Sequence, residues 1–485
     1  MSPGKSKWPY QNLLFLSTMT PYFLPFKESG TTMNWILCSV ILMMIASLPS
    51  TTSAQAIRFQ PQGAAAAGQG NAFAAQADDA SAIHYNPAGM TQLSGIHMQL
   101  NTFLVGGSVK FTSPAGVNTQ GDFGNIIAWP LPTQSYVTAN LRDLGFRHVG
   151  NTVIGLGLTT PYALQSRYPL NGPFQTAVTS AALPLLDIKP TVAYQLNDQL
   201  SIGVGADIYT FASFIGEGHL EQKFNWPGGG GIPASTPVEV NGNGTALGFN
   251  LSLLYTPFRN QDGKPLVNVG LQYRSQARTE LTGQFLVNGA LAADTRTPVT
   301  LPQIFTLAVA LWPVRDRDHE WKLEFDVDYV GWKSFRSLDI HLSTGGSLPQ
   351  PQNWRNSPVF MFGTEYKWLH PDILPNWEVA LRGGYTYTEN PGPDSTFTPA
   401  AATLNSHGIT LGTGVLCRAG GHFLGLIPCG GAEDQWYFPK GIGTSVAYLS
   451  FIHEARSVMG NINPTVDGTY RLWSHMGTFN LNLIF

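Results

Sequence analysis

The sequence has little charge. Asp, Glu, Lys and Arg make up 12% of its 485 residues, against about 25% in soluble globular domains. A soluble protein of this length needs more charge on its surface, whereas a surface that faces lipid does not. The net charge of −3 and the lack of a basic run give no reason to expect a nucleic-acid partner. The composition therefore favours a membrane protein.

The sequence also lacks an apolar run long enough to span a bilayer comfortably as a helix. Its longest run, Trp35–Leu48, is followed by Pro49 and by small residues in which Ala-Gln-Ala at 54–56 fits a signal-peptidase site. We interpret residues 1–56 as a signal peptide with an N-terminal extension, cleaved after Ala56 or Ala54. Met33 is an alternative start, and an uncleaved anchor helix is the alternative interpretation.

Cysteine is scarce, with three residues in the chain. Cys38 lies in the apolar run and leaves with the signal peptide, so Cys417 and Cys429 remain in an oxidising compartment. The Gly-rich stretch between them can bend back on itself. A disulfide between Cys417 and Cys429 is one hypothesis, and two unpaired thiols are the other.

Sustained helical periodicity is missing as well, and many segments alternate with a period of two. In one of them, apolar Trp321, Leu323, Phe325, Val327 and Tyr329 alternate with Lys322, Glu324, Asp326 and Asp328. The apolar face of such a strand meets a second sheet in a soluble sandwich, and lipid in a membrane barrel whose charged face turns into the lumen. The signal peptide, the low charge and the aromatic strand ends favour the barrel.

We therefore predict an all-β fold, a transmembrane antiparallel β-barrel over residues 96–485. An even number of strands places both termini in the periplasm, where connections are short, and the opposite connections are long. The connection 417–442 is an exception, which is either an insertion or an error in the strand count. We predict fourteen strands, at 96–110, 131–142, 151–161, 188–197, 199–212, 244–258, 265–275, 300–313, 320–335, 356–369, 376–388, 404–416, 443–455 and 470–485.

A short stretch before the barrel carries the most specific motif. A small-residue run at 63–76 cannot form a thick core of its own, so it needs an enclosure. It is followed by 77–90, Ala-Asp-Asp-Ala-Ser-Ala-Ile-His-Tyr-Asn-Pro-Ala-Gly-Met. There Asp78 and Asp79 offer oxygens to cap local backbone amides, and the bond before Pro87 keeps Asn86 out of the helical region.

This order of motifs resembles the N-terminal hatch of the FadL-type outer-membrane family, and Asn86, Pro87 and Ala88 are its most specific match. The family takes up long-chain fatty acids and, in its TodX-like branch, aromatic hydrocarbons. Residues 271–275, 330–335, 381–385 and 467–470 also resemble family motifs, so the resemblance spans roughly residues 55–485. The 417–442 stretch and the N-terminal 32 residues depart from it. The resemblance implies a hatch at 57–95 that plugs a barrel of fourteen strands.

The resemblance also implies a route. Substrate is captured by extracellular loops, passes to a pocket near the hatch, and leaves sideways at an inward kink in the third strand, for which Gly155, Gly157 and Pro161 are the candidates. The alternative is an ordinary strand that ends at Pro161. Candidate ligand-binding residues are Ile57, Phe59, Phe211 and Phe214. A disordered N-terminal tail and interfacial aromatic residues are the alternatives for these four.

For the substrate, the resemblance favours long-chain fatty acids, with aromatic or aliphatic hydrocarbons as the alternative. A carboxylate would need a cation such as Arg58, Arg274 or Arg382, although each is expected to neutralise lumen acids such as Asp326 or Glu378 instead. The last strand ends on Phe485 and resembles the signal read by the barrel assembly machinery. Expected partners are therefore hydrophobic small molecules, outer-membrane lipid and that machinery, for a monomer in the bacterial outer membrane.

Other functions have less support. None of the 11 histidines lies in a Gly-x-Ser-x-Gly context or a His-Glu-x-x-His motif. We therefore expect no catalytic residues, no metal and no cofactor, so that a lipid hydrolase is disfavoured. A general porin is disfavoured because a hatch would block bulk water.

Overall fold

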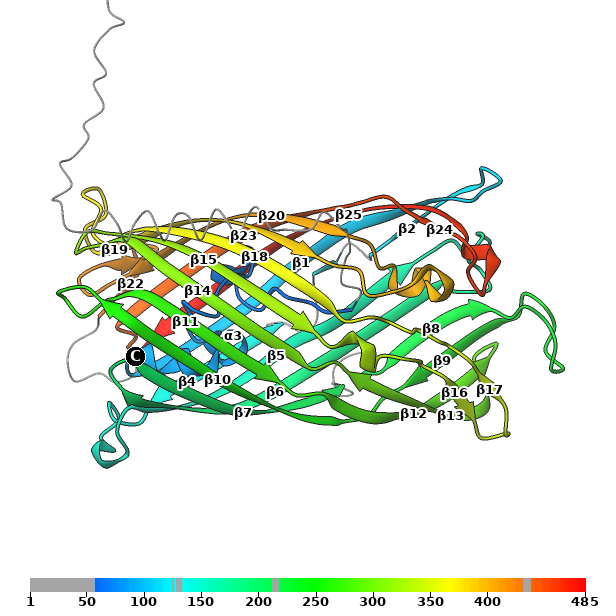
Figure 1. Cartoon of the computed structure of the whole chain (residues 1–485), viewed down its shortest axis with the longest axis horizontal. Helices are drawn as coiled ribbons and strands as arrows, with labels where there is room; N and C mark the ends of the chain where they lie inside the picture. The colour runs from blue at the N-terminus through cyan, green and yellow to red at the C-terminus, as the bar shows by residue number, and fades with distance from the viewer. Residues whose placement is uncertain (1–56, 124–125, 128–132, 212–217, 431–437) are drawn as a thin grey trace, which may run out of the picture. The chain divides into compact units, whose positions relative to one another are not determined.

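The computed structural model describes residues 57–485 except 124–125, 128–132, 212–217 and 431–437. The predicted signal peptide therefore lies outside the described residues. In the described chain a single antiparallel sheet closes on itself (Figure 1), because β25 pairs with β1 along sixteen consecutive positions, from His97 opposite Ile484 to Thr112 opposite Thr469. The closed ring runs through β1 (Ile96–Thr112), β4 (Gln134–Asn140), β5 (Thr152–Arg167), β6 (Ser180–Asn197), β7 (Leu200–Phe211), β10 (Ala246–Arg259), β11 (Pro265–Arg274), β14 (Ile304–Arg315), β15 (His319–Val330), β18 (Ser357–Trp368), β19 (Trp377–Thr388), β20 (Ser406–Cys417), β23 (Gly441–His453) and β25 (Gly468–Ile484).

Each predicted strand range overlaps one strand of this ring, but the whole sheet contains 23 strands. The prediction of fourteen therefore undercounts the strands of the sheet. Long connections at 218–243, 276–299 and 336–355 contain strand hairpins that lengthen the wall. The additional strands are β2 (Asn118–Asp122), β3 (Ile126–Ile127), β8 (Leu220–Asn225), β9 (Pro237–Gly242), β12 (Ala277–Val287), β13 (Ala290–Leu301), β16 (Ile340–Leu342), β17 (Ser347–Leu348) and β24 (Arg456–Val458).

The two ends of the barrel differ. We call the end that holds Ile96 and Phe485 the terminal end, and the opposite end, which carries the additional strands, the loop end. Connections at the terminal end are mostly short, such as 198–199 between β6 and β7 and 316–318 between β14 and β15. Short one-turn 3-10 helices lie in the connections: η2 (Arg147–Val149), η3 (Trp332–Ser334), η4 (Asp394–Thr396), η5 (Pro399–Ala401) and η6 (Pro464–Val466).

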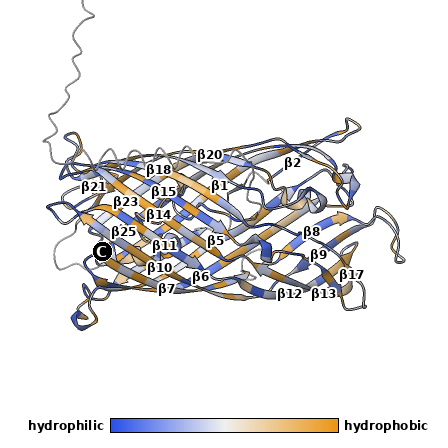
Figure 2. Cartoon of the chain, viewed as in Figure 1, coloured by the Kyte–Doolittle hydropathy of each residue, from blue (hydrophilic) through white to orange (hydrophobic). Residues whose placement is uncertain are grey.

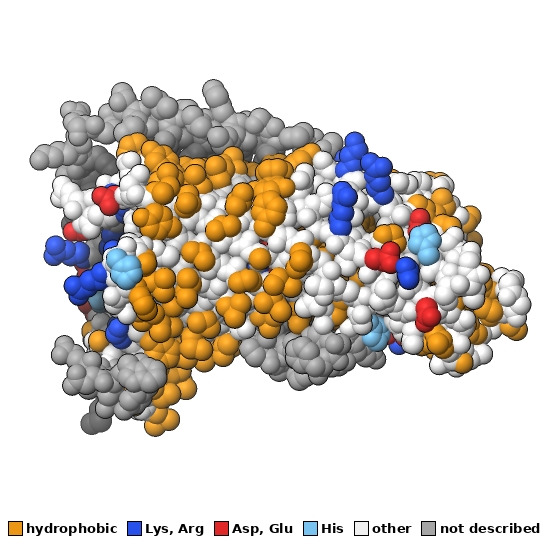
Figure 3. All heavy atoms as spheres, turned by 90° about the horizontal axis from the view of Figure 1, so that it is seen from below, with side chains coloured by type: hydrophobic (Ala, Val, Ile, Leu, Met, Phe, Trp, Pro, Cys, Tyr) orange, Lys and Arg blue, Asp and Glu red, His pale blue; other side chains and the backbone are white. Residues whose placement is uncertain are grey.

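The faces of the strands distinguish a membrane barrel from a soluble sandwich. On β15 the charged residues Lys322, Glu324 and Asp326 are buried inside, while Trp321 and Tyr329 point outward. The outward apolar rows have no second sheet over them in the described chain; Leu247, for example, is 70% exposed. Figure 2 shows the alternation along the strands, and Figure 3 shows the resulting apolar band on the outer surface. Apolar side chains outside and charges inside are typical of a wall that faces lipid.

Among the described residues, no helix has the length and apolar character needed to cross a membrane.

Residues 57–95, the N-terminal segment, lie inside the ring. Three short helices form here: α2 (Ala64–Ala67), α3 (Ala82–Tyr85) and η1 (Pro87–Gln92). Asn86 is extended, with φ −163°, and its side chain accepts a hydrogen bond from Ala88 N at 3.1 Å, so that it caps η1, which Pro87 begins. The Asn86 amide also donates to the Ala74 carbonyl at 2.7 Å. This residue thus ties both halves of the N-terminal segment together.

Inward-pointing carboxylates of β15 hold the N-terminal segment in place. One oxygen of Asp326 accepts the backbone N–H groups of Phe73 and Ala74, at 3.0 and 2.9 Å. Glu324 accepts those of Ala75 and Gln76, at 2.7 and 3.2 Å. The charged row predicted from the alternation of β15 therefore serves as a set of acceptors for a segment that cannot bond its own amides in such short helices.

The two predicted capping aspartates have different partners. Asp79 accepts from the Ser81 backbone N–H at 2.8 Å, as a local cap. Asp78 caps no backbone amide of the described chain; it accepts from the Gln76 side chain at 3.1 Å and pairs with Lys367 of β18 at 3.2 Å. The expectation for Asp78 was wrong because a lysine of the wall, distant in sequence, lies within its reach.

Wall glycines let the N-terminal segment approach the strands closely. A Cβ on Gly270 of β11 would lie 2.4 Å from the Ala74 carbonyl oxygen, and one on Gly384 of β19 would lie 2.2 Å from the Gln69 carbonyl carbon. The small residues of 63–76 and these glycines therefore fit backbone against backbone.

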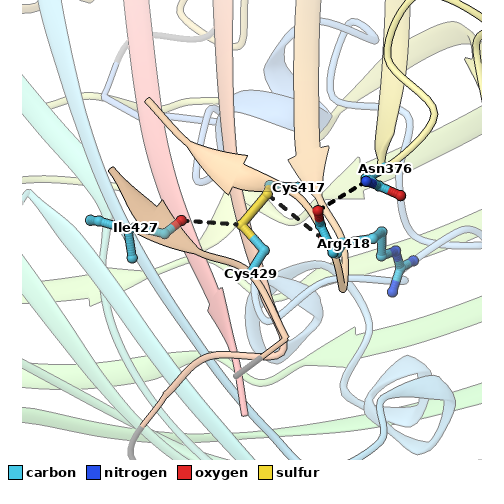
Figure 4. The surroundings of a disulfide bond; sticks show 6 residues. Asn376, Cys417, Arg418, Ile427 and Cys429 are labelled. Atoms are coloured by element: carbon cyan, nitrogen blue, oxygen red, sulfur yellow. Dashed lines mark hydrogen bonds between the residues drawn. A yellow bond between two sulfur atoms is a disulfide. The ribbon is translucent and has the colours of Figure 1, made fainter. Parts of the chain in front are cut away.

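The connection between β20 and β23 is an insertion at the terminal end. The two strands pair directly from Ser406 opposite His453 to Cys417 opposite Ile442, so the strand order does not slip there. Cys417 and Cys429 form a disulfide, with their Cα atoms 6.0 Å apart (Figure 4). Between them β21 (His422–Phe423) and β22 (Ile427–Pro428) form a small hairpin.

Candidate substrate site

A large apolar cavity lies between the barrel strands of the loop end and the connections that cover them. Its empty volume of about 1230 Å³ includes open solvent, so the cavity is only partly enclosed. Its lining contains no Asp, Glu, Lys, Arg or His, and its polar members are neutral, such as Gln222 and Asn241. The apolar members include Ile57, Leu164, Leu183, Leu185, Tyr209, Phe211, Leu220, Val240, Ala246, Leu281, Val299, Leu301, Phe335, Leu338, Ile340 and Trp354. A cavity of this kind suits an apolar ligand.

Buried aromatic residues give the cavity a rigid side. Trp332 and Trp354 pack edge to face with ring centres 5.0 Å apart, and Phe335 lies 4.6 Å from Trp354. Tyr162 joins this cluster from β5, with its ring 6.4 Å from that of Trp332. Such ring pairs contribute stabilisation beyond that of their buried area, which keeps this side of the cavity in one geometry.

Residues 57–59, the start of the N-terminal segment, lie beside the cavity, and Ile57 is the one among them that lines it. They lie along β5 as an added strand: Phe59 N donates to the Pro161 carbonyl at 2.8 Å, and Ala163 N donates to the Ile57 carbonyl at 3.0 Å. Ile57 then turns its side chain into the cavity lining. The backbone of the first described residues is thus ordered by a ladder partner.

This added strand covers an irregular part of β5. Thr159 to Tyr162 are all buried, so the alternation of faces fails there, and the pairing of β5 with β6 shifts between Thr159 and Tyr162. Pairing with β4 ends at Leu158. Among the described residues, β5 has no strand partner on this side from Thr159 to Ser166 other than residues 57–59.

Gly155 and Gly157, which together with Pro161 are the candidates for an inward kink, lie in regular pairing with both β4 and β6. The expectation that they interrupt the ladder was wrong. A Cβ on either would lie 2.8 Å from the Ile83 side chain, so their role is to admit α3. The irregularity lies at Thr160 and Pro161 instead, where proline has no N–H to donate.

Next to the cavity, beginning at Arg58, is a polar layer inside the barrel. Arg58 pairs with Asp328 at 2.5 Å, and both side chains are buried. Arg274 lies 3.8 Å from Asp207, which also pairs with Lys189, and Arg382 pairs with Glu365 at 2.6 Å. All three arginines thus neutralise lumen acids, though Asp326 and Glu378 are not their partners. Burial, with Arg274 nearby, lowers the pKa of His84 well below its usual value, so its ring is neutral in this layer.

The four predicted ligand-binding residues have different positions. Ile57 and Phe211 line the cavity, whereas Phe59 stacks on Phe103 of β1 at 4.4 Å and does not. Phe214 lies outside the described residues. Sequence reasoning missed Leu183, Tyr209 and Trp354, because they converge from strands and connections far apart in the chain, and no local pattern marks them.

One group of side chains offers metal-ligand atoms. One ligand atom each of His219, Glu221 and Glu239 lies within 4.8 Å of the other two, at the loop end. Lys223 lies between the two carboxylates, 3.0 Å from Glu221 and 3.5 Å from Glu239. The ammonium group of Lys223 already pairs with both carboxylates, so we assign no metal to the group.

A closed wall with a lipid-facing surface, an interior filled by the chain's own N-terminal segment and an uncharged apolar cavity define a membrane transporter for hydrophobic compounds.

Comparison with known proteins narrows this class. Residues 46–412 match the family described as outer membrane protein transport protein (OMPP1/FadL/TodX). Because the match covers more than half of the sequence, the chain belongs to this family. The chain is therefore an outer-membrane transporter of hydrophobic compounds, and the predicted family and location are confirmed.

Individual relatives agree. The chain is 22% identical over 381 residues to the long-chain fatty acid transport protein of Escherichia coli O6:H1, covering 71% of this chain and 80% of the relative. It resembles the crystal structure of a Pseudomonas aeruginosa FadL homologue, with a TM-score of 0.68, 16% identity, and coverage of 89% and 100%. It also resembles the Ralstonia pickettii toluene transporter TbuX, with a TM-score of 0.55, 14% identity, and coverage of 88% and 99%. These structures show the shared fold.

Proposed function

We propose that this protein takes up long-chain fatty acids by capture at the loop end, rearrangement of the N-terminal segment as a hatch, and lateral release through the wall beside β5. One observation carries the proposal. Ile57 lines the apolar cavity, and residues 57–59 also occupy the edge of β5 that has no other described strand partner. A ligand that moves these residues therefore acts on the cavity and on the wall together.

The direction of release follows from the pairing. If residues 57–59 leave β5, the carbonyl of Pro161 and the N–H of Ala163 lose their partners. A gap then opens between β4 and β5 at the level of Thr159 to Tyr162, which are all buried and where the pairing of β5 with β6 shifts. An apolar molecule leaves through such a gap into lipid without crossing water, which the hydrophobic effect favours.

Arg58 supports a fatty acid as the substrate. It follows Ile57 directly, and its second guanidinium nitrogen, Nη1, is buried with no hydrogen-bond partner. A fatty-acid carboxylate beside it would satisfy that donor. The absence of charge from the cavity lining favours the alternative, a neutral aromatic or aliphatic hydrocarbon. The alternation along β25 supports delivery by the barrel assembly machinery, and we propose that the protein is a monomer.

The first experiment fills the cavity. Radiolabelled oleate and labelled toluene are supplied to cells that lack their own hydrophobic transporter and express this protein. Ala246→Phe places a ring in the lining, and Leu247→Phe, on the next residue of β10, faces lipid and is the matched control. We expect Ala246→Phe to abolish uptake and Leu247→Phe to preserve it. Equal uptake by both variants, or free entry of a small sugar into cells with the unaltered protein, would contradict the proposal.

The second experiment separates the two substrate classes. Arg58→Gln removes the cation, and Asp328→Asn removes its partner but keeps the cation. A fatty-acid transporter loses oleate uptake in Arg58→Gln and keeps it in Asp328→Asn. If toluene enters and oleate does not in the unaltered protein, the hydrocarbon alternative holds.

A further inference from the structure

The disulfide-bonded hairpin at residues 418–430 lies against the outer face of the barrel. On β19, β20, β23 and β25 the outward positions near the middle of the wall are exposed, as at Leu381, Leu411 and Val446. The outward positions of the same strands at the terminal end are covered: Cys417 and Ile442 are buried, and Leu481 and Leu483 pack beside them. Phe423 of the hairpin stacks on Trp377 of β19, with ring centres 6.1 Å apart. The hairpin therefore covers the outward apolar side chains of these four strands at the terminal end of the barrel.

The hairpin exposes its own apolar tip in turn. Leu424 is 78% and Leu426 is 82% exposed, and Ile427 is 44% exposed. The adjoining turn between β18 and β19 adds Ile373, which is 92% exposed. That turn is bonded to the hairpin, because Arg418 N donates to the Asn376 carbonyl at 2.8 Å and the Asn376 side chain donates to the Gly420 carbonyl at 3.0 Å. Large apolar groups left this bare at one rim of a barrel need a partner.

The backbone at the tip supports a selected role for the leucine. Leu424 has φ +52°, in the left-handed region that favours Gly or Asn. A turn shaped by stability alone would place one of those residues there. The hairpin instead keeps a leucine in this conformation at its exposed tip, where the side chain makes no core contact.

The depth of the tip matches a lipid interface. Trp377 is four residues from the exposed Leu381 on β19, so at about 3.3 Å per residue the hairpin lies within about 13 Å of the apolar band. The tip thus continues the lipid-facing surface. Trp377 and the half-exposed Arg418 beside it are residue types that favour the boundary between hydrocarbon and headgroups.

We propose that the hairpin of residues 418–430 is an interfacial anchor that inserts Leu424 and Leu426 into the membrane leaflet at the terminal end of the barrel. Short connections mark this end as periplasmic, so the partner is the phospholipid of the inner leaflet. The disulfide fixes the hairpin against the wall, which holds the tip at one depth. This anchor does not depend on the transport route proposed above.

Spin labelling in liposomes of the full-length protein tests the anchor. A nitroxide is attached at Leu426→Cys and, in a second variant, at Leu424→Cys, and its collision rates with oxygen and with a water-soluble nickel chelate are compared. Leu411→Cys is the lipid-facing control, and Leu291→Cys, a 58% exposed leucine in the β12–β13 hairpin of the loop end, is the water-facing control. Each variant is first checked for the heat-dependent gel shift of a folded barrel.

The proposal predicts oxygen-to-nickel collision ratios at positions 424 and 426 well above that at 291 and below that at 411, as expected for a shallow position in the leaflet. A ratio equal to that at 291 would overturn it. Protection from both reagents, with disulfide-linked dimers formed through position 426, would also overturn it, because the partner would then be a second copy of the chain.

Discussion

Asp326 allows a quantitative test of how the N-terminal segment is held. Its buried carboxylate accepts the backbone N–H groups of Phe73 and Ala74, and Asp326→Ala removes both bonds. Hydrogen bonds to a charged group contribute about 1.5–3 kcal/mol each, so the docked segment should lose about 3–6 kcal/mol. Asp326→Asn keeps one acceptor oxygen without the charge, and we expect about half of that loss.

Hydrogen exchange measured by mass spectrometry reads this loss directly. At about 1.4 kcal/mol per factor of ten, residues 63–92 should exchange at least about 100-fold faster in Asp326→Ala and about tenfold faster in Asp326→Asn. Val327→Ala, on the lipid-facing side of the same strand, is the control and should leave exchange unchanged. Unchanged protection of residues 63–92 from exchange in Asp326→Ala, with the heat-dependent gel shift of the barrel retained, would contradict this role of Asp326.

Three further predictions concern the same segment and the insertion. Gly384→Ala should displace the segment and raise ion conductance in planar bilayers, since its Cβ meets Gln69 at 2.2 Å, whereas Gly383→Ala, whose Cβ finds no atom nearer than 3.8 Å, should not; equal conductance would count against close packing. A thiol reagent should label Cys417 and Cys429 only after reduction, and labelling of the unreduced protein would exclude the bond. Burial raises the pKa of Asp79 to about 6 from its usual 3.8, so the docked segment binds a proton at Asp79 more tightly than the undocked segment does. Docking should therefore weaken as the pH rises from about 4 to about 6. Exchange corrected for intrinsic rates should show this pH dependence, and Asp79→Asn should remove it; a pH dependence that survives in that variant would assign it to another group.

Local patterns predicted the wall well. Alternation on β15 and β10 identified which side chains face lipid and which face the lumen, because a period of two leaves no other arrangement once one face is apolar. The motif around Asn86 was found for a similar reason. Its extended residue followed by Pro87 is dictated by neighbours one or two positions away.

Contacts between segments that are distant in the chain could not be predicted from the sequence. Gly155 and Gly157 are visible as glycines, but only the position of Ile83 shows that they admit a helix and do not break a strand. Asp78 carries a local capping signal, yet it pairs with Lys367, 289 residues away. The cavity lining is the extreme case, since its members come from many elements and share no spacing in the chain.

The position of the N-terminal segment has a consequence for how the chain folds. Thr410 of β20 accepts the Gly70 N–H and donates to the Gly68 carbonyl, contacts that span 340 and 342 residues. The N-terminal segment must therefore wait for nearly the last part of the chain before these backbone groups find their partners. Because the segment is enclosed by the ring, the seam between β1 and β25 has to close around it. Contacts of such long sequence separation make folding slow, so closure of this seam is the step at which we expect assembly to be limited.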